Sequence, residues 1–234
     1  MKILALDSSG LVASVAVVEN DTLLAEYTVN YKKTHSQTLL PMLDEISNMT
    51  ELDLSTIDAI AVAGGPGSFT GLRIGSATAK GLGLALEKPL ISIPTTAAIA
   101  YNIWDTDKFV CPIMDARRNQ VYTGVYCYTD HRLDTVWEQD TMSIEALAEG
   151  LNCLDHEVIF LGDGVAVYRE KLEALLTIPF SFAPAHVNRQ RAAAVGALAE
   201  VYYKEGKTET AAEHAPEYLR LSQAERELKL KKER

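Results

Sequence analysis

Short apolar segments and turn-forming residues alternate from the start of the chain. Residues 3–6 form an apolar run that stops at the turn cluster Asp7-Ser8-Ser9-Gly10, as is typical of a buried strand. Two further apolar runs, 12–18 and 23–29, are separated by Asn20-Asp21, which is a hairpin-turn signal. The pattern therefore predicts that the chain opens with three consecutive strands.

A helical pattern follows these strands. Large apolar residues recur at helical spacing between positions 39 and 49, and Thr34-His35-Ser36-Gln37 before them fits a capping box. Pro41 lies inside the pattern, so it either kinks the helix or marks its first turn. Beyond it the sequence predicts a strand over 57–63, a glycine loop over 64–68, a helix over 72–86, a strand over 90–93 and a helix over 95–104.

The second part of the chain repeats this order. An apolar strand over 109–114 ends at Asp115, as the first strand ends at Asp7. The remaining predicted elements are strands over 121–128 and 133–137, a helix with Ser143 as its cap, a strand over 158–161, the loop Gly162-Asp163-Gly164, and helices over 169–176 and 191–204. An internal repeat of about 100 residues is a strong architectural signal.

This repeat predicts an α/β protein with the actin-like fold that Hsp70 and the sugar kinases share (the ASKHA fold), in which nucleotide binds between two duplicated βββαβα halves. We expect an N-terminal subdomain over 1–104, a C-terminal subdomain over 105–220 and a charged tail over 221–234. From position 226 the tail holds five basic and two acidic residues, so it either contacts RNA or forms a solvated helical end.

Composition narrows the class of protein. With 47% hydrophobic and 23% charged residues over 234 positions, the chain is globular rather than intrinsically disordered. A net charge of −10 makes it a poor stand-alone nucleic-acid binder, because neutralising phosphates supplies most of that affinity. Three cysteines without a CxxC pair argue against a disulfide framework, and no segment has the length of a membrane span. We expect a cytoplasmic protein.

The glycine loop is the first candidate for chemistry. Glycines between a strand and a helix often let backbone amides hold a phosphate, although neither G-x-x-x-x-G-K-[ST] nor G-x-G-x-x-G is present here. The loop therefore either binds an anion or is a structural turn. The helix after it carries Gly71, Gly75, Ala79 and Gly83 at four-residue spacing, which serves close packing on the protein's own sheet or on another subunit.

Carboxylates and histidines give weaker evidence for a functional site. Asp7 and Asp115 each end a first strand, where they either face a nucleotide with Mg²⁺ or close an Asx turn. The five histidines include no pair at helical metal-ligand spacing. The sequence shows neither a G-x-S-x-G elbow nor a cysteine in an activating motif, so it offers no nucleophile–base pair.

Five longer runs of the chain are distinctive: Leu4-Ala5-Leu6-Asp7-Ser8-Ser9, His35-Ser36-Gln37-Thr38-Leu39-Leu40-Pro41-Met42, Gly65-Pro66-Gly67-Ser68-Phe69-Thr70-Gly71-Leu72-Arg73-Ile74-Gly75, Met114-Asp115-Ala116-Arg117-Arg118 and Tyr218-Leu219-Arg220. From the first strand to about residue 220, they resemble one family, TsaB, also called YeaZ. The third run is long and specific.

The resemblance implies an actin-like protein that takes part in making threonylcarbamoyladenosine (t6A) on the adenosine next to the tRNA anticodon. In that family TsaB is not the transferase. It pairs with and activates TsaD, its larger paralogue, which holds the metal and transfers the threonylcarbamoyl group, and the ATPase TsaE joins the pair. TsaD-type proteins carry two metal-binding histidines on a helix, whereas the comparable stretch here, 93–101, has none.

The resemblance also supplies candidate sites and partners. It implies no catalytic and no metal-binding residue, a heterodimer with TsaD, a homodimer when the chain is alone, and contact with tRNA only through the complex. The nucleotide candidates, with ATP or ADP bound only within the complex, are Asp7, Ser8, Gly162, Asp163 and Gly164. The partner-interface candidates, on the helices after His35 and Gly71, are His35, Leu39, Leu43, Gly71, Gly75, Thr78, Ala79 and Leu82.

Two other functions remain open from the sequence. A free-standing small-molecule kinase or ATPase would fit the duplicated cleft architecture and Asp7, and it predicts ATP turnover by the pure protein. A metalloprotease would require bound metal, and the sequence shows no ligand set for one.

Overall fold

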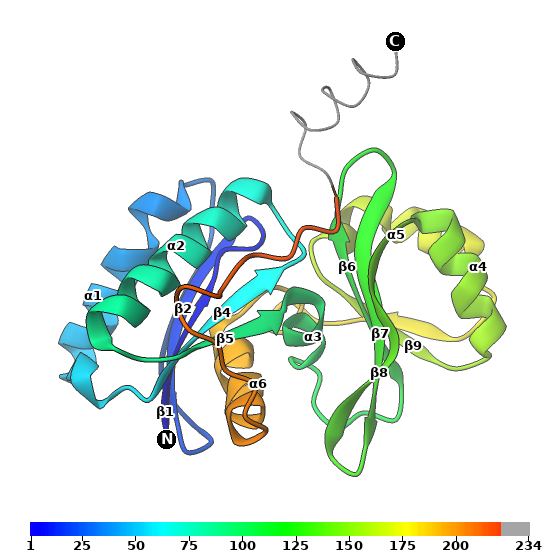
Figure 1. Cartoon of the computed structure of the whole chain (residues 1–234). Coiled ribbons are helices and arrows are strands. Elements are labelled where there is room, and N and C mark those ends of the chain that lie inside the picture. Colours follow the sequence, from blue (N-terminus) through cyan, green and yellow to red (C-terminus); the bar gives the residue numbers. More distant parts are fainter. Residues whose placement is uncertain (221–234) are drawn as a thin grey trace.

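The computed structural model describes residues 1–220 as two five-stranded sheets that lie side by side (Figure 1). In spatial order, the first sheet consists of β3 (Thr22–Asn30), β2 (Val12–Glu19), β1 (Lys2–Asp7), β4 (Ala59–Gly65) and β5 (Leu90–Pro94). The second consists of β8 (Arg132–Ser143), β7 (Gln120–Thr129), β6 (Phe109–Asp115), β9 (Val158–Leu161) and β10 (Phe180–Phe182).

The two sheets have the same topology. The central strand of each, β1 or β6, pairs antiparallel with the next strand in sequence on one side. On its other side it pairs parallel with β4 or β9. Because β1 has neighbours on both sides and helices on both faces, Leu4 and its neighbours Val17 and Ile60 are almost wholly buried. The predicted duplication and the actin-like fold are confirmed.

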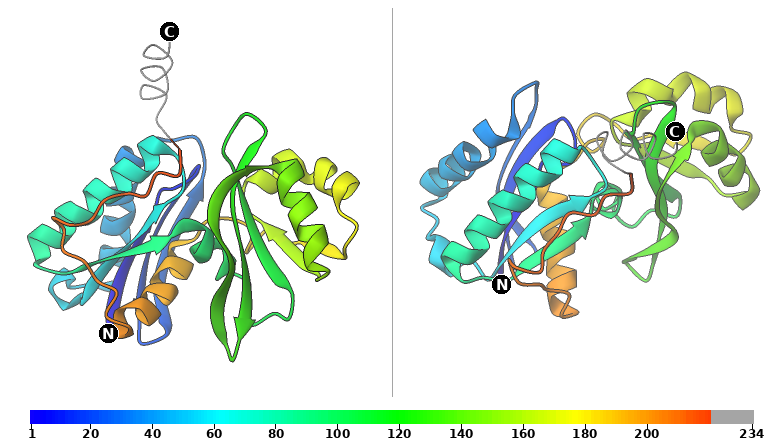
Figure 2. Two further views of the ribbon diagram at one scale, coloured as in Figure 1. Left: turned by 45° about the vertical axis from the view of Figure 1, so that its right-hand side comes forward. Right: turned by 45° about the horizontal axis from the view of Figure 1, so that its top comes forward.

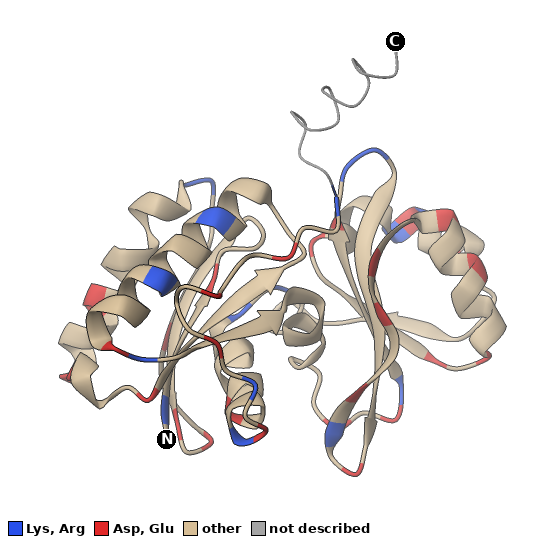
Figure 3. Cartoon of the chain, viewed as in Figure 1, with Lys and Arg blue, Asp and Glu red and all other residues tan. Residues whose placement is uncertain are grey.

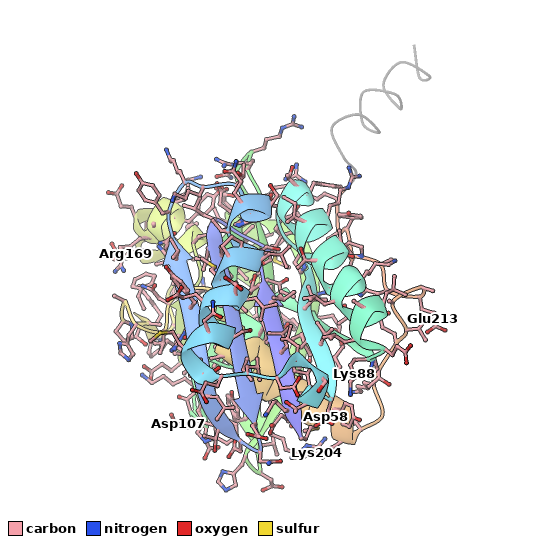
Figure 4. The ribbon with its side chains drawn as sticks, turned by 90° about the vertical axis from the view of Figure 1, so that its left-hand side faces the viewer. Asp58, Lys88, Asp107, Arg169, Lys204 and Glu213 are labelled. Atoms are coloured by element: carbon pink, nitrogen blue, oxygen red, sulfur yellow. The ribbon has the colours of Figure 1, made fainter. Side chains whose placement is uncertain are left out.

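Helices cover the outer face of each sheet. The first sheet is covered by α1 (Leu39–Thr50) and α2 (Phe69–Leu86), which lie side by side in Figure 4, and a short 3₁₀ turn, η1 (His35–Gln37), precedes α1. The second sheet is covered by α4 (Ile144–Leu154) and α5 (Gly164–Leu175). A second 3₁₀ turn, η2 (Leu54–Thr56), leads into β4.

Each of the remaining two helices packs on the sheet of the other half. α3 (Thr95–Ala100) follows the last strand of the first sheet but packs on β6 and β7 as well. α6 (Ala192–Lys204) follows the last strand of the second sheet but packs on β1 and β2 of the first, and Figure 2 shows this orange helix against the blue strands. A Cβ on Gly196 would lie 2.8 Å from Val18 Cγ2, so glycine permits the close approach.

One hydrophobic cluster therefore belongs to both halves. It contains Ile3 and Ala5 from the first sheet, Val110 and Tyr122 from the second, and Ala199 from α6. Each half also has a cluster of its own beneath its outer helices. A shared core means that the two sheets stabilise one another rather than forming independent globules.

The last described segment, residues 214–220, is a strap that ties the halves together. The Glu217 amide donates to the Gly64 carbonyl at 2.7 Å, and Gln139 Nε2 of β8 donates to Glu217 Oε2 at 2.6 Å. Tyr218 stacks on Phe69 with ring centroids 4.6 Å apart, and Arg220 donates to the Ala116 carbonyl. The predicted charged tail, 221–234, lies outside the described residues.

Several predicted helix ends are wrong. α2 begins at Phe69 rather than 72, because Ser68 Oγ accepts from the Gly71 amide and caps it. α5 begins at Gly164 rather than 169, and α3 ends at Ala100 rather than 104. The predicted capping box does not form, since Thr34 Oγ1 donates to the Gln37 side chain instead of accepting from a backbone amide.

Other details are confirmed or were missed. Pro41 occupies the first turn of α1, where its lack of an N–H carries no cost, and Ser143 Oγ accepts from the Ala146 amide as the predicted cap. β8 extends to Ser143 instead of ending at 137. The three-residue strand β10 was not predicted, since a segment this short carries too little pattern.

Candidate functional site: a cleft between the halves

A cavity of about 620 Å³ opens where the two halves meet. Its first side is formed by the β1–β2 turn, η1 and the start of α2, and its second side by the β6–β7 turn with Asp163. Arg220 of the strap closes one edge. The cleft is therefore built from the turns that follow the central strands, as the repeat predicted.

The glycine loop packs directly on the β1–β2 turn. The Ser68 amide donates to the Ser9 carbonyl at 2.7 Å. A Cβ on Gly67 would lie 2.3 Å from that same carbonyl oxygen, and a Cβ on Gly71 would lie 2.0 Å from the Ser8 carbonyl oxygen. Close backbone approach thus requires glycine at both positions, as expected if the loop is a structural turn. The loop still lines the cleft through the same glycines and the side chains of Ser68 and Phe69.

Asp7 and Ser8 lie beneath the surface of the cleft rather than on it. Asp7 is fully buried, and its Oδ1 accepts from the Ser9 amide at 2.9 Å and from Ser9 Oγ at 2.7 Å, which is an Asx turn. Ser8 Oγ donates to the Gly71 carbonyl at 2.9 Å. Burial raises the pKa of Asp7 to about 6, although the bonds from Ser9 oppose the rise. Neither residue lines the cleft, and Asp7 Oδ2 has no hydrogen-bond partner within residues 1–220.

The loop Gly162-Asp163-Gly164 approaches the cleft from the second half. A Cβ on Gly162, whose φ is +101°, would lie 2.2 Å from the Ile113 carbonyl oxygen, so the loop packs against β6. Asp163 Oδ1 accepts from the Asp115 amide at 3.3 Å, and both carboxylates line the cleft. Burial raises the pKa of Asp163, although the bond from the Asp115 amide and the charge of Arg189 oppose the rise, and the Asp115 carboxylate adds to it.

Sequence reasoning missed a basic rim around this cleft. Lys33 lines the first side, Arg117 and Arg118 line the second, and Arg220 borders the strap. Figure 3 shows these basic turns at the upper ends of both halves of an otherwise acidic chain. The signal was present in the run Met114-Asp115-Ala116-Arg117-Arg118, to which no binding role was assigned.

The β6–β7 turn presents these arginines in an uncommon conformation. Arg117, Arg118 and Asn119 have φ values of 66°, 56° and 60°, a left-handed stretch that non-glycine residues rarely adopt. Asn119 is held there by Lys171 Nζ at 2.5 Å and by its own bond to Glu145 at 2.8 Å. Strained turns of this kind are concentrated at functional sites.

The partner-interface candidates fall into two groups. Leu39, Leu43, Gly71, Gly75 and Ala79 are buried inside this chain, whereas His35, Thr78 and Leu82 are half-buried. A Cβ on Gly75 would lie 2.4 Å from Ser8 Oγ, and one on Gly83 would lie 2.4 Å from Leu90 Cδ1. The glycines of this small-residue stripe thus pack on the protein's own sheet, which is the first of the two roles that their spacing left open.

A different face of α2 is exposed. A row at helical spacing, here called the α2 outer stripe, consists of Ile74, Ala77, Thr78, Gly81 and Leu84. Leu84 is 69% exposed, and a Cβ on Gly81 would meet nothing within 4 Å. The neighbouring α1 adds Leu40, which is 54% exposed. Apolar side chains on two adjacent helices are suited to packing against helices of another subunit.

The described residues show no basis for metal or thiol chemistry. Within residues 1–220 no three histidine, cysteine, aspartate or glutamate side chains are grouped so that they could hold a metal ion. Burial raises the pKa of the Cys111 thiol to about 12, so it is not an activated nucleophile. None of the described helices combines the length and apolar character that crossing a bilayer requires.

The duplicated sheets and the cleft between them define an actin-like α/β protein. The ethanolamine utilization protein EutJ from Carboxydothermus hydrogenoformans shows the same fold, with a TM-score of 0.55 at 11% identity over 85% of this chain and 90% of EutJ. A family model described as "TsaD: tRNA N6-adenosine threonylcarbamoyltransferase" matches residues 22–228. These matches agree with the actin-like fold of the two sheets.

Closer relatives fix the family. The tRNA threonylcarbamoyladenosine biosynthesis protein TsaB of Bacillus subtilis is 34% identical, with 96% of each chain covered, and the Haemophilus influenzae protein of that name is 32% identical, with 94% of each covered. The structure of YeaZ from Pseudomonas aeruginosa has a TM-score of 0.81 at 27% identity, covering 93% of this chain and 99% of that one. The chain belongs to the TsaB (YeaZ) family.

Proposed function

We propose that this chain is the non-catalytic subunit of the t6A-forming system, which pairs with a TsaD-type transferase and activates it. The similarity to proteins named for threonylcarbamoyladenosine biosynthesis, over nearly the whole chain, supports the pathway. The observation that carries the pairing is the α2 outer stripe with Leu40 of α1, where Leu84 and Leu40 are exposed and a Cβ on Gly81 would meet nothing within 4 Å.

The geometry of Asp7 supports the non-catalytic role. In the actin-like plan the carboxylate that ends the first strand is the one expected at a nucleotide. Here Asp7 is fully buried, and its Oδ1 is occupied by two bonds from Ser9. The resemblance further implies that TsaE joins the pair and that tRNA is reached only through the complex.

Substitution of the α2 outer stripe tests the pairing. Leu84→Asp places a charge on the exposed face, so we expect it to weaken binding to the same organism's TsaD-type protein at least tenfold, about 1.4 kcal/mol. Val167→Asp is the matched control, since Val167 is 59% exposed on α5 of the other half. Light scattering on a sizing column should give a one-to-one heterodimer for the wild type and the control only.

Unchanged pairing by Leu84→Asp would remove the proposed surface, and failure of the wild type to pair, with TsaE and nucleotide present, would remove the proposed function. Substitution of Gly75 is not a suitable test, because its Cβ would collide with Ser8 inside the monomer. The same experiment on the chain alone reports whether the stripe also forms a homodimer.

The basic rim supports ATP or ADP binding within the complex. Lys33, Arg117 and Arg118 face the cleft from both sides, where a polyphosphate would be neutralised. A free-standing kinase or ATPase is the alternative that the same cleft permits. It requires ATP turnover with Mg²⁺ by the pure protein that Asp163→Asn abolishes, and we expect no turnover above that of a buffer control.

A further inference from the structure

A second cavity, of about 540 Å³, lies apart from the cleft and shares no lining residue with it. Its walls are the β2 and β3 ends near Val12 and Asn30, and the segment 185–191 that leads into α6. Gly10 of the β1–β2 turn lines the cleft and touches Gln190, which lines the second cavity. The two sites are therefore separated by the thickness of that turn.

Gln190 is the unusual residue of the second cavity. Its side chain is 99% buried, yet neither Oε1 nor Nε2 has a hydrogen-bond partner within the described chain. The amide packs against Gly10, where an added Cβ would lie 2.5 Å from Nε2. A buried amide without partners loses its hydration and gains nothing in return, so folded proteins rarely retain one without a use for it.

Two polar side chains of the same cavity, Glu26 and Thr28, bond to groups other than Gln190. Glu26 accepts from Arg191 Nε at 3.1 Å and Nη2 at 2.5 Å, and from the Ala193 amide at 3.1 Å. Thr28 Oγ1 shares a hydrogen bond of 2.6 Å with Ser14 Oγ. Neither residue bonds to Gln190, so the Gln190 amide is left with an unused donor and an unused acceptor within the described chain.

These two groups define the ligand that the cavity fits. A side-chain amide presents its donor and acceptor side by side, so the complementary ligand edge carries an acceptor next to a donor, as a carboxamide or a nucleobase does. The charge of Glu26 is cancelled by Arg191, and Arg189, which also lines the cavity, donates to the carbonyls of Gly162 and Asn188, so both arginines of this wall are already engaged within the chain. The volume lies within the range of small-molecule sites.

We propose that the second cavity binds a small neutral ligand through such a carboxamide or nucleobase edge, with Gln190 as its recognition residue. Neither amide atom is exposed in the free chain, so binding requires rotation about the last torsions of the Gln190 side chain. This proposal is independent of pairing with TsaD, because no residue of the α2 outer stripe lines the cavity.

Thermal unfolding of the free protein is the first test. Gln190→Met keeps the side-chain volume and removes the unpartnered groups, so its Tm should rise by several degrees. Gln139→Met is the matched control, because the Gln139 amide accepts from Thr96 at 2.9 Å and donates to Glu217 at 2.6 Å. Its Tm should fall. A fall in the Tm of Gln190→Met would show that the amide serves the fold, and would overturn the proposal.

Ligand-induced shifts in Tm are the second test, with adenosine and nicotinamide, each at millimolar concentration, as probes. A rise with adenosine alone identifies a nucleobase site, and a rise with nicotinamide alone identifies a carboxamide site. The ligand-induced rise in Tm must disappear in Gln190→Met. It must persist in Asp163→Asn, because Asp163 lines the cleft and not the second cavity. A wild type that responds to neither probe, or a rise that persists in Gln190→Met, overturns the proposal.

Discussion

At the scale of single residues, the β1–β2 turn shows how small side chains seal a carboxylate. Gly67 and Gly71 let the glycine loop lie directly on the carbonyls of Ser9 and Ser8. The preceding residue, Asp7, is fully buried, so both of its carboxylate oxygens lose hydration while Ser9 compensates only one of them. Asp7, which the sequence left open as either a nucleotide ligand or an Asx-turn residue, is therefore a buried titratable group.

We expect Asp7→Asn to stabilise the protein at pH 7.5. The folded-state pKa of about 6 lies above the ordinary 3.8, so the folded chain binds the Asp7 proton more tightly than the unfolded chain does. Protonation of Asp7 therefore adds to the free energy of unfolding. This addition is present in full below pH 3.8 and is lost as the pH rises through about 6. Because asparagine has no charge to bury, the gain at pH 7.5 should be about 1–3 kcal/mol.

Urea unfolding at pH 7.5 and at pH 4 measures this difference. The advantage of Asp7→Asn should be largest at pH 7.5 and nearly absent at pH 4, where the wild-type carboxyl is protonated in the folded state. Equal gains at both pH values would mean that the effect does not come from ionisation of Asp7. Asp53→Asn is a suitable control, since Asp53 lies on the surface, where its bonds with Ser55 lower its pKa.

At the scale of elements, α2 presents two kinds of glycine on two different faces. Gly71 and Gly75 lie on the face against β1 and the turn after it, where a Cβ would collide with Ser8. Gly81 lies on the outer stripe, in open space. One face of α2 therefore packs inside the chain, and another is available for a partner.

A pair of matched substitutions separates the two faces. Gly71→Ala should destabilise the protein by roughly 2–4 kcal/mol, because its Cβ would lie 2.0 Å from the Ser8 carbonyl oxygen and force the backbone apart. Gly81→Ala should stabilise it by about 0.5–1 kcal/mol, since alanine favours the helix and meets nothing. Urea unfolding of both variants checks this, and a neutral Gly71→Ala would contradict the packing.

The same helix shows what the sequence could and could not predict. Four-residue spacing of small side chains correctly indicated close approach, but periodicity does not say whether Gly75 meets its own sheet or another subunit. The order of strands and helices was predictable, because apolar runs and turn residues report local structure. The basic rim was not predictable, because Lys33, Arg117 and Arg220 are far apart in sequence and line the same cleft only in the folded chain.

At the scale of the whole molecule, the exchanged helices and the strap join the two halves. α6 lies on β1 and β2, α3 lies on β6 and β7, and the strap bonds to Gly64 and Ala116 in different halves. The cleft is therefore bordered by parts that are linked at three places. The division at residues 104 and 105, proposed from the sequence, separates the two sheets but leaves α6 on the far side of the boundary.

We expect residues 1–104 alone not to form a stable fold. Without α6, buried residues such as Ile3, Ala5 and Ala16 would be exposed on the face of the first sheet. A fragment of residues 1–104 should show few dispersed amide signals in a proton–nitrogen correlation spectrum. Addition of a peptide spanning 186–206 in trans should increase their dispersion, and a well-dispersed spectrum of the fragment alone would contradict the dependence on α6.

The exchange of α6 also sets an order of events during synthesis. The strands of the first sheet leave the ribosome early, but the helix that covers their inner face is translated about 100 residues later. At ordinary elongation rates this interval is roughly 5–20 s, far longer than the collapse of a small chain. Nascent chains of this protein should therefore be clients of ribosome-bound chaperones until α6 emerges from the exit tunnel.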